Sequence, residues 1–114
     1  FLPGPVTLIL RTKRNFAKGV TRDRNIAVRI PSNRTALELA KESPVVTTSA
    51  NRHNSEIAKS MDEAIQTFGS QCAYLDGEKP MGVESTIIDL TQDKPEIKRI
   101  GALYSSILEG IIEF

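Results

Sequence analysis

Six short apolar runs, rich in β-branched residues, divide the chain into pieces that suit strands better than long helices. They cover residues 6–10, 26–30, 44–48, 72–75, 85–90 and 96–100. Runs of this length that end at Pro, Gly or polar residues are typical of strands. Pro5 and Pro31 mark two of the boundaries, because proline lacks the N–H that a central strand needs. The sequence therefore predicts a sheet built from several short strands.

Helical patterns separate these runs. Residues 32–42 carry apolar side chains on one face, and Ser60 with Glu63 forms a capping box in front of a second apolar face that ends at Gly69. Residues 104–112 form a third candidate helix. Strand and helix patterns in alternation predict an α/β fold with a mixed sheet.

The composition is that of a globular protein. The chain has 114 residues and 12.6 kDa, with 39% hydrophobic and 25% charged residues, which suits one domain and excludes a disordered or disulfide-rich chain. No apolar run approaches the about 18 residues that a membrane span needs. We therefore expect a soluble, cytoplasmic protein with no membrane partner.

The chain has little material for covalent or metal chemistry. It contains one cysteine, Cys72, and one histidine, His53, so no intrachain disulfide and no zinc-ligand cluster is expected. Cys72 stands in a strand-like run, which predicts a buried core thiol. We assign no nucleophile, no general base and no metal ligand, and expect any chemistry to depend on binding and electrostatics.

The net charge of +1 conceals an uneven distribution. Residues 1–57 hold 10 Lys and Arg against 4 Asp and Glu, whereas residues 58–114 hold 5 against 10. Between residues 11 and 34 only Asp23 is acidic among eight cations, namely Arg11, Lys13, Arg14, Lys18, Arg22, Arg24, Arg29 and Arg34. Such a basic run attracts phosphate-bearing partners. The alternative is a solvated loop whose charge balances the acidic half.

Three polar features stand at the ends of predicted strands. Ser49 and Asn51 follow the run 44–48, Ser85 and Thr86 open the run 85–90, and Arg29 interrupts the run 26–30. Hydroxyl and amide groups at strand ends can bind a phosphate or a sugar, and a guanidinium can clamp a carboxylate or phosphate. Each feature also has a purely structural explanation: a turn, a strand start and a solvent-facing side chain.

Taken in order, five segments resemble the YrdC family. They are residues 3–7 (Pro-Gly-Pro-Val-Thr), 27–31 (Ala-Val-Arg-Ile-Pro), 48–51 (Thr-Ser-Ala-Asn), 82–89 (Gly-Val-Glu-Ser-Thr-Ile-Ile-Asp) and 99–102 (Arg-Ile-Gly-Ala). The resemblance implies a twisted mixed β-sheet with flanking helices around a positively charged cleft. It also implies a nucleotidyltransferase, an L-threonylcarbamoyladenylate synthase. Such an enzyme forms threonylcarbamoyl-AMP and pyrophosphate from L-threonine, bicarbonate and ATP, for threonylcarbamoyladenosine modification of tRNA.

The resemblance also implies roles for single residues. Ser49 and Asn51 would contact the phosphates of ATP, Arg99 would lie on the nucleotide side, and Pro5 and Thr7 would line the adenosine pocket. Mg²⁺ is expected on the phosphates.

A second group would hold the amino acid. The resemblance implies that Arg29 binds the threonine carboxylate or the nascent carbamate. Ser85 and Thr86 would lie at the threonine and α-phosphate end.

The sequence departs from the family pattern in two respects that matter. Family members carry an upstream Lys-x-Arg element that residues 1–114 lack. We therefore expect residues 1–114 to be the C-terminal portion of a single YrdC-like domain, incomplete at the N-terminus and inactive alone. Arg52, His53 and Asn54 also replace a small turn that relatives favour after Ser-Ala-Asn, which predicts a more basic loop.

Two other functions stay open. The basic run could bind double-stranded RNA or tRNA through the backbone, although only Phe16 interleaves it for stacking. A YrdC-like carbamoyl-transfer paralogue is the other alternative. If the synthase interpretation holds, the downstream partner is the tRNA threonylcarbamoyl-transferase machinery.

Overall fold

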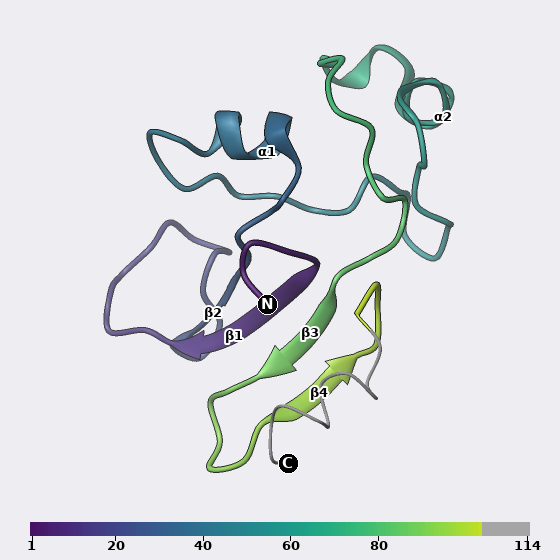
Figure 1. Cartoon of the computed structure of the whole chain (residues 1–114). Helices are drawn as coiled ribbons and strands as arrows, with labels where there is room; N and C mark the ends of the chain where they lie inside the picture. Colours follow the sequence, from purple (N-terminus) through teal and green to yellow (C-terminus); the bar gives the residue numbers. More distant parts are fainter. Residues whose placement is uncertain (104–114) are drawn as a thin grey trace. The chain divides into compact units, whose positions relative to one another are not determined.

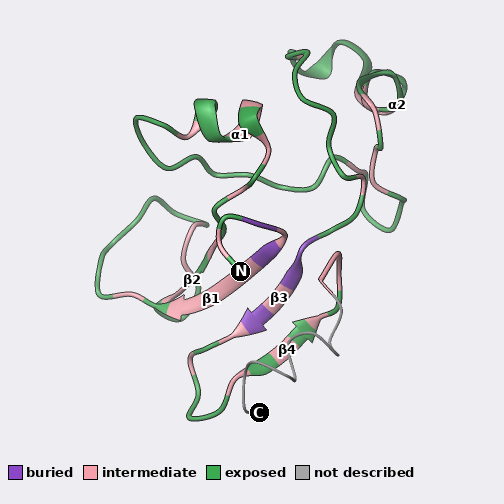
Figure 2. Cartoon of the chain, viewed as in Figure 1, coloured by how far each residue is buried: buried purple, intermediate pink, exposed green. Residues whose placement is uncertain are grey.

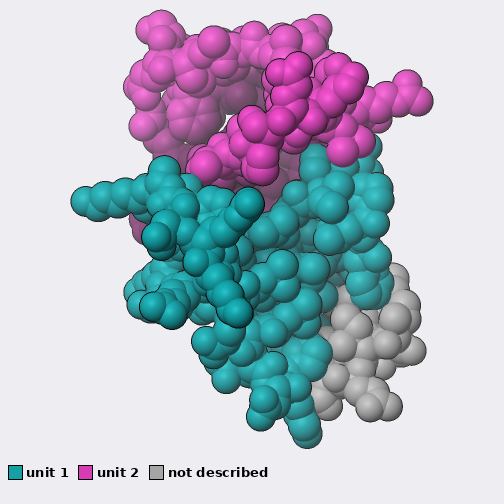
Figure 3. Space-filling model, turned by 90° about the vertical axis from the view of Figure 1, so that its left-hand side faces the viewer, with its two compact units in different colours: residues 1–32, 85–114 teal, residues 33–84 magenta. Residues whose placement is uncertain are grey.

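The structure, a computed structural model, describes residues 1–103. The chain divides into two compact units, coloured separately in Figure 3. One unit contains residues 1–32 together with the segment that starts at residue 85, and the other contains residues 33–84. Within residues 1–103, the first unit holds the sheet and the second holds the helices.

A four-stranded mixed sheet forms the first unit (Figure 1). Its strands are β1 (Val6–Arg11), β2 (Asn25–Val28), β3 (Thr86–Asp89) and β4 (Glu96–Arg99), in the order β2-β1-β3-β4. The two central strands, β1 and β3, are parallel, and each outer strand is antiparallel to its neighbour. The predicted mixed sheet is thus confirmed.

The core of this unit lies on the two central strands (Figure 2). Val6 of β1 and Ile88 of β3 are fully buried, and Leu8, Ile97 and Leu103 pack against them in part. Full burial of a Val or Ile side chain stabilises a fold by about 1.5–3 kcal/mol each. This small core therefore fixes the parallel pairing of β1 with β3.

The second unit contains α1 (Arg34–Leu39), α2 (Met61–Phe68) and a short 3₁₀ turn, η1 (Gly69–Gln71). The N-cap of α2 is Ser60, whose hydroxyl accepts from the N–H of Glu63 at 3.2 Å. The helix ends at Gly69, whose φ of 55° and ψ of −129° suit glycine almost alone. The predicted helix and both of its boundaries are confirmed.

The helix predicted over residues 32–42 is shorter than expected. It starts after Asn33, whose side chain accepts from the N–H of Ala36 at 3.1 Å, and ends at Leu39. The Glu78 carboxylate accepts from the N–H of Arg34, so a distant segment also caps this helix. The third candidate helix, over residues 104–112, lies outside the described residues.

Two predicted strands are wrong. Residues 44–48 and 72–75 form no strand, and the side chains of Val46 and Leu75 are 77% and 65% exposed. Their sequences favour extended backbone, but a strand also needs a neighbour to hydrogen-bond with, and none within residues 1–103 pairs with them. For the same reason Cys72 is an exposed free cysteine, not the core thiol we predicted.

Within the described part of the chain, no helix is long and apolar enough to cross a membrane.

Candidate ligand-binding site

The strand directions bring six of the eight candidate residues to one end of the sheet. β1 and β3 start at this end, and the antiparallel β2 and β4 finish there. The residues gathered at these strand ends are Pro5, Thr7, Arg29, Ser85, Thr86 and Arg99. The mixed pairing thus places residues that are up to 94 positions apart in the sequence at the same end of the sheet.

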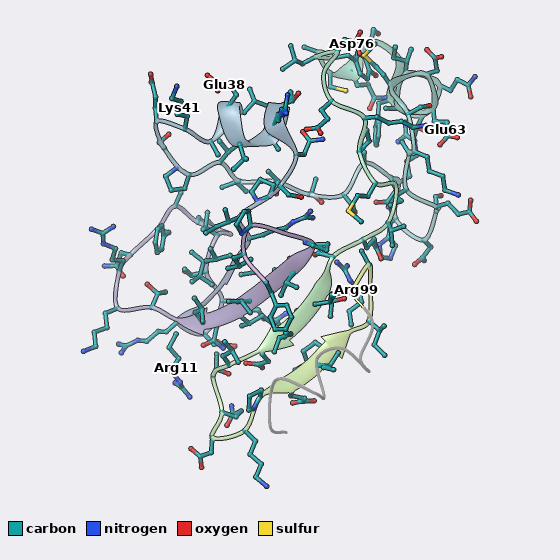
Figure 4. All side chains as sticks on the ribbon, in the orientation of Figure 1. Arg11, Glu38, Lys41, Glu63, Asp76 and Arg99 are labelled. Carbon is teal, nitrogen blue, oxygen red and sulfur yellow. The ribbon has the colours of Figure 1, made fainter. Side chains whose placement is uncertain are left out.

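Thr7, Ser85 and Arg99 form a hydrogen-bonded group there. The parallel register sets Val6 opposite Thr86, which places Thr7 and Ser85 close enough for their hydroxyl oxygens to lie 2.7 Å apart. Arg99, labelled beside the start of β3 in Figure 4, donates from Nε and Nη2 to the Ser85 carbonyl at 3.0 and 2.9 Å. Its Nη2 also lies 3.3 Å from the Ser85 hydroxyl oxygen.

This arrangement can recognise an anionic or hydroxyl-bearing ligand. The two hydroxyls have two protons, and their mutual hydrogen bond uses one of them, so the other can be donated to a ligand. The Arg99 guanidinium adds a fixed positive charge beside them, and charge-assisted hydrogen bonds are the stronger kind. Hydroxyl pair and guanidinium together suit a carboxylate or a phosphate.

Thr86 has its hydroxyl turned inward. The side chain is fully buried, and its Oγ1 donates to the Leu103 carbonyl at 2.6 Å. The same oxygen accepts from the N–H groups of Gly101 and Leu103 at 2.9 and 3.2 Å. Thr86 therefore holds the segment after β4 against the start of β3, directly behind Ser85. Its predicted role as a ligand residue stays a prediction.

Arg29 lies just beyond β2 and not within it. The strand ends at Val28, two residues earlier than we expected. The exposed Arg29 side chain donates from Nε to the Gly4 carbonyl at 3.1 Å, beside Pro5. This contact ties the end of β2 to the segment that enters β1. It places a second guanidinium at the same end of the sheet.

Ser49 and Asn51 belong to the other unit, residues 33–84. They do not follow a strand, since residues 44–48 form none. The Ser49 hydroxyl donates to the Asn51 side-chain oxygen at 2.5 Å. The Asn51 amide nitrogen donates to the carbonyls of Arg52 and Ser55 at 3.1 and 3.0 Å. The two residues thus form one hydrogen-bonded loop.

All eight cations of the basic run are exposed: Arg11, Lys13, Arg14, Lys18, Arg22, Arg24, Arg29 and Arg34. Their exposure agrees with either of the two interpretations given above. Within residues 1–103, no three or more His, Cys, Asp or Glu side chains gather in a way that could hold a metal ion.

Sequence reasoning missed the part that Arg52 takes in the second unit. Arg52 Nη2 donates to the carbonyl of Thr67 at 3.1 Å, and its guanidinium carbon lies 5.7 Å from the centre of the Phe68 ring. Arg52 was noticed only as a departure from the family pattern. No local signal links it to a helix end 15 residues later.

The mixed four-stranded sheet, with polar side chains gathered at one end, places the chain in the class of α/β proteins. The Sua5/YciO/YrdC family model, described as telomere recombination, matches residues 1–101. The chain belongs to this family, which confirms the resemblance seen in the sequence.

Curated relatives are about one third identical to the chain over the aligned residues. The threonylcarbamoyl-AMP synthase of Pyrococcus abyssi is 34% identical over 117 residues, covering 98% of this chain and 34% of the relative. The threonylcarbamoyl-AMP synthase of Bacillus subtilis is 30% identical over 118 residues, with coverages of 98% and 34%.

Solved structures agree with this. The structure of P. abyssi Sua5 complexed with L-threonine matches with a TM-score of 0.87 and 32% identity, covering 99% of this chain and 35% of that one. E. coli YciO matches with a TM-score of 0.70 and 30% identity, covering 88% and 52%. The chain thus spans about a third to a half of the length of these relatives.

Proposed function

We propose that the protein containing this chain is a threonylcarbamoyl-AMP synthase. It joins L-threonine, bicarbonate and ATP into threonylcarbamoyl-AMP and pyrophosphate, and passes the adenylate to a tRNA threonylcarbamoyl-transferase in the cytoplasm. Relatives with this activity match almost the whole chain at 30–34% identity, which supports the proposal. Because the chain spans only part of them, the activity is proposed for the product of the complete gene, called the complete protein below.

The observation that carries the proposal is the group formed by Thr7, Ser85 and Arg99. Its two hydroxyls lie 2.7 Å apart, and a guanidinium lies 3.3 Å from one of them. The Ser85 hydroxyl would bind L-threonine, which offers a carboxylate and a hydroxyl, and Thr7 with Arg99 would bind the adjacent nucleotide, so the two substrates would meet at this group. Arg29 adds a second positive charge for the carboxylate or for the carbamate.

The reaction needs no nucleophile from the protein. The threonine ammonium first loses a proton to solvent, and the free amine then attacks the carbon of bicarbonate and forms a carbamate with loss of water. A carbamate oxygen then attacks the α-phosphorus of ATP, and the bond to pyrophosphate breaks. The protein has to align the substrates and spread positive charge over the anionic transition state, which guanidinium and hydroxyl groups can do.

ATP would bind through Ser49 and Asn51 at its phosphates, with Arg99, Pro5 and Thr7 on the nucleotide side. Mg²⁺ usually binds one or two carboxylates together with substrate phosphates. The hydroxyl, amide and guanidinium groups of the candidate residues do not form such a carboxylate set. Mg²⁺ would therefore bind to the ATP phosphates and not to these side chains.

Calorimetric titration of the complete protein with L-threonine tests the proposal. We expect saturable binding, weaker binding of L-valine, which has a methyl in place of the hydroxyl, and an about tenfold loss of affinity in Ser85→Ala. Ser70→Ala, which removes an exposed hydroxyl from η1, is the matched control and should bind as the wild type does. Equal binding of L-valine, or no loss in Ser85→Ala, would contradict the proposed threonine site.

The exposed basic run supports a second candidate function, binding of double-stranded RNA or tRNA. Backbone contacts of this kind weaken steeply as salt rises. Salt-sensitive RNA binding by a complete protein that binds no L-threonine would favour this function over the synthase.

A further inference from the structure

The loop that carries Ser49 and Asn51 is held together by the Asn51 side chain. Its amide nitrogen donates one hydrogen bond to the carbonyl of Arg52 and one to that of Ser55, and its side-chain oxygen accepts from the Ser49 hydroxyl. The N–H of Ser55 donates to the Arg52 carbonyl at 3.0 Å, so that one carbonyl accepts two hydrogen bonds. The Arg52 carbonyl therefore accepts two of the hydrogen bonds that hold this loop.

Arg52 is itself fastened to the C-terminal end of α2. Its Nη2 donates to the Thr67 carbonyl at 3.1 Å, and its guanidinium stands over the Phe68 ring at 5.7 Å. Both contacts are favourable for a cation, since the last carbonyls of a helix carry partial negative charge and the face of an aromatic ring is electron-rich. Through these two contacts the exposed Arg52 side chain links the loop to the C-terminal end of α2.

The other end of the loop is fastened to the same helix. The N–H of Lys59 donates to the Glu63 carboxylate in the first turn of α2 at 2.7 Å. The N–H of Ala58 donates to the Ala50 carbonyl at 2.8 Å and closes the loop. Helix α2 thus supports the loop at both ends, and Arg52 makes the link on the Asn51 side.

We propose that Arg52 is a positioning residue that clamps the Ser49–Asn51 loop to α2 and so orders it for the phosphates of ATP. The inference rests on the proposed function for the ligand and on the contacts above for the clamp. Arg52 acts through its carbonyl, which holds Asn51, while its guanidinium is engaged with Thr67 and Phe68. The competing explanation is that Arg52 contacts the phosphates directly.

Amide hydrogen exchange of the complete protein without nucleotide tests the clamp by itself. We expect the amides of Ser55 and Ala58 to exchange about five- to tenfold faster in Arg52→Ala. They should also exchange faster in Phe68→Leu, which removes the aromatic ring but keeps the charge of Arg52. Lys94→Ala, which removes an exposed cation from the other unit, is the matched control and should leave both rates unchanged. Unchanged rates in Arg52→Ala would overturn the clamp.

Pyrophosphate release separates positioning from direct contact. Positioning predicts that Arg52→Ala raises the KM for ATP about three- to tenfold and leaves the KM for L-threonine unchanged. Phe68→Leu should act in the same direction and add little in the double variant. Direct contact predicts a different result: Arg52→Ala raises the KM for ATP and makes that KM less dependent on salt, while Phe68→Leu has no effect. This result would overturn the positioning role. Faster exchange in a protein whose wild type binds no ATP would uphold the clamp and contradict the proposed function.

Discussion

Thr86 supports the backbone at one end of the sheet through hydrogen bonds of a single buried hydroxyl. Its hydroxyl satisfies three backbone groups of residues 101–103 while the side chain is completely buried. Ser85, its neighbour, presents its hydroxyl to Thr7 and Arg99. The resemblance implies ligand roles for both residues. Both are buried, and they differ in their partners: the Thr86 hydroxyl bonds to backbone groups, and the Ser85 hydroxyl lies against Thr7 and Arg99.

Replacing Thr86 with valine tests this supporting role. Valine has nearly the same shape but leaves two N–H groups and a carbonyl without their partner, so Thr86→Val should lower the free energy of unfolding by about 2–3 kcal/mol. Thr86→Ser keeps the hydroxyl and loses a methyl group, and should cost only about 1 kcal/mol. Denaturant unfolding of both variants provides the measurement. A larger cost for serine than for valine would contradict the account.

At the scale of elements, local signals predicted boundaries well. Ser60, Glu63 and Gly69 define both ends of α2, because capping depends on residues within one turn. The runs at 6–10, 85–90 and 96–100 form strands close to the predicted limits. Residues 44–48 and 72–75 have the same local character and form none, because strand pairing depends on distant residues that no local pattern reveals.

The turn between β3 and β4 has an acid-sensitive hydrogen bond. The hydroxyl and the N–H of Thr91 both donate to the Asp89 carboxylate, at 2.6 and 2.8 Å, and lower the pKa of Asp89 below its ordinary 3.8. The resulting stabilisation is fully present above the unfolded-state pKa of about 3.8 and is lost as the pH falls through the lower folded-state pKa.

Thr91→Val should therefore move the NMR titration midpoint of the Asp89 carboxyl upward, toward 3.8. Stability should also depend less on pH in the acid range, since the folded and unfolded pKa values then lie closer together. Thr67→Val is the control, because the Thr67 hydroxyl donates to the Glu63 carbonyl and not to a carboxylate. An unchanged Asp89 midpoint in Thr91→Val would refute the assignment.

At the scale of the whole molecule, the site could be predicted only in part. The sequence shows which polar residues stand near strand ends. Their closeness in space depends on the parallel pairing of β1 with β3, whose paired residues lie 80 positions apart. The clamp at Arg52 was invisible, because it joins a loop to a helix end through one long side chain. Resemblance to a family supplied the roles, and the structure supplied the contacts through which those roles could be carried out.

The most direct test of the synthase proposal is pyrophosphate release from ATP by the complete protein in bicarbonate buffer, with and without L-threonine. The account predicts release that requires L-threonine and that Arg29→Ala or Asn51→Ala abolishes. Release that is independent of L-threonine, or full activity in both variants, would contradict it.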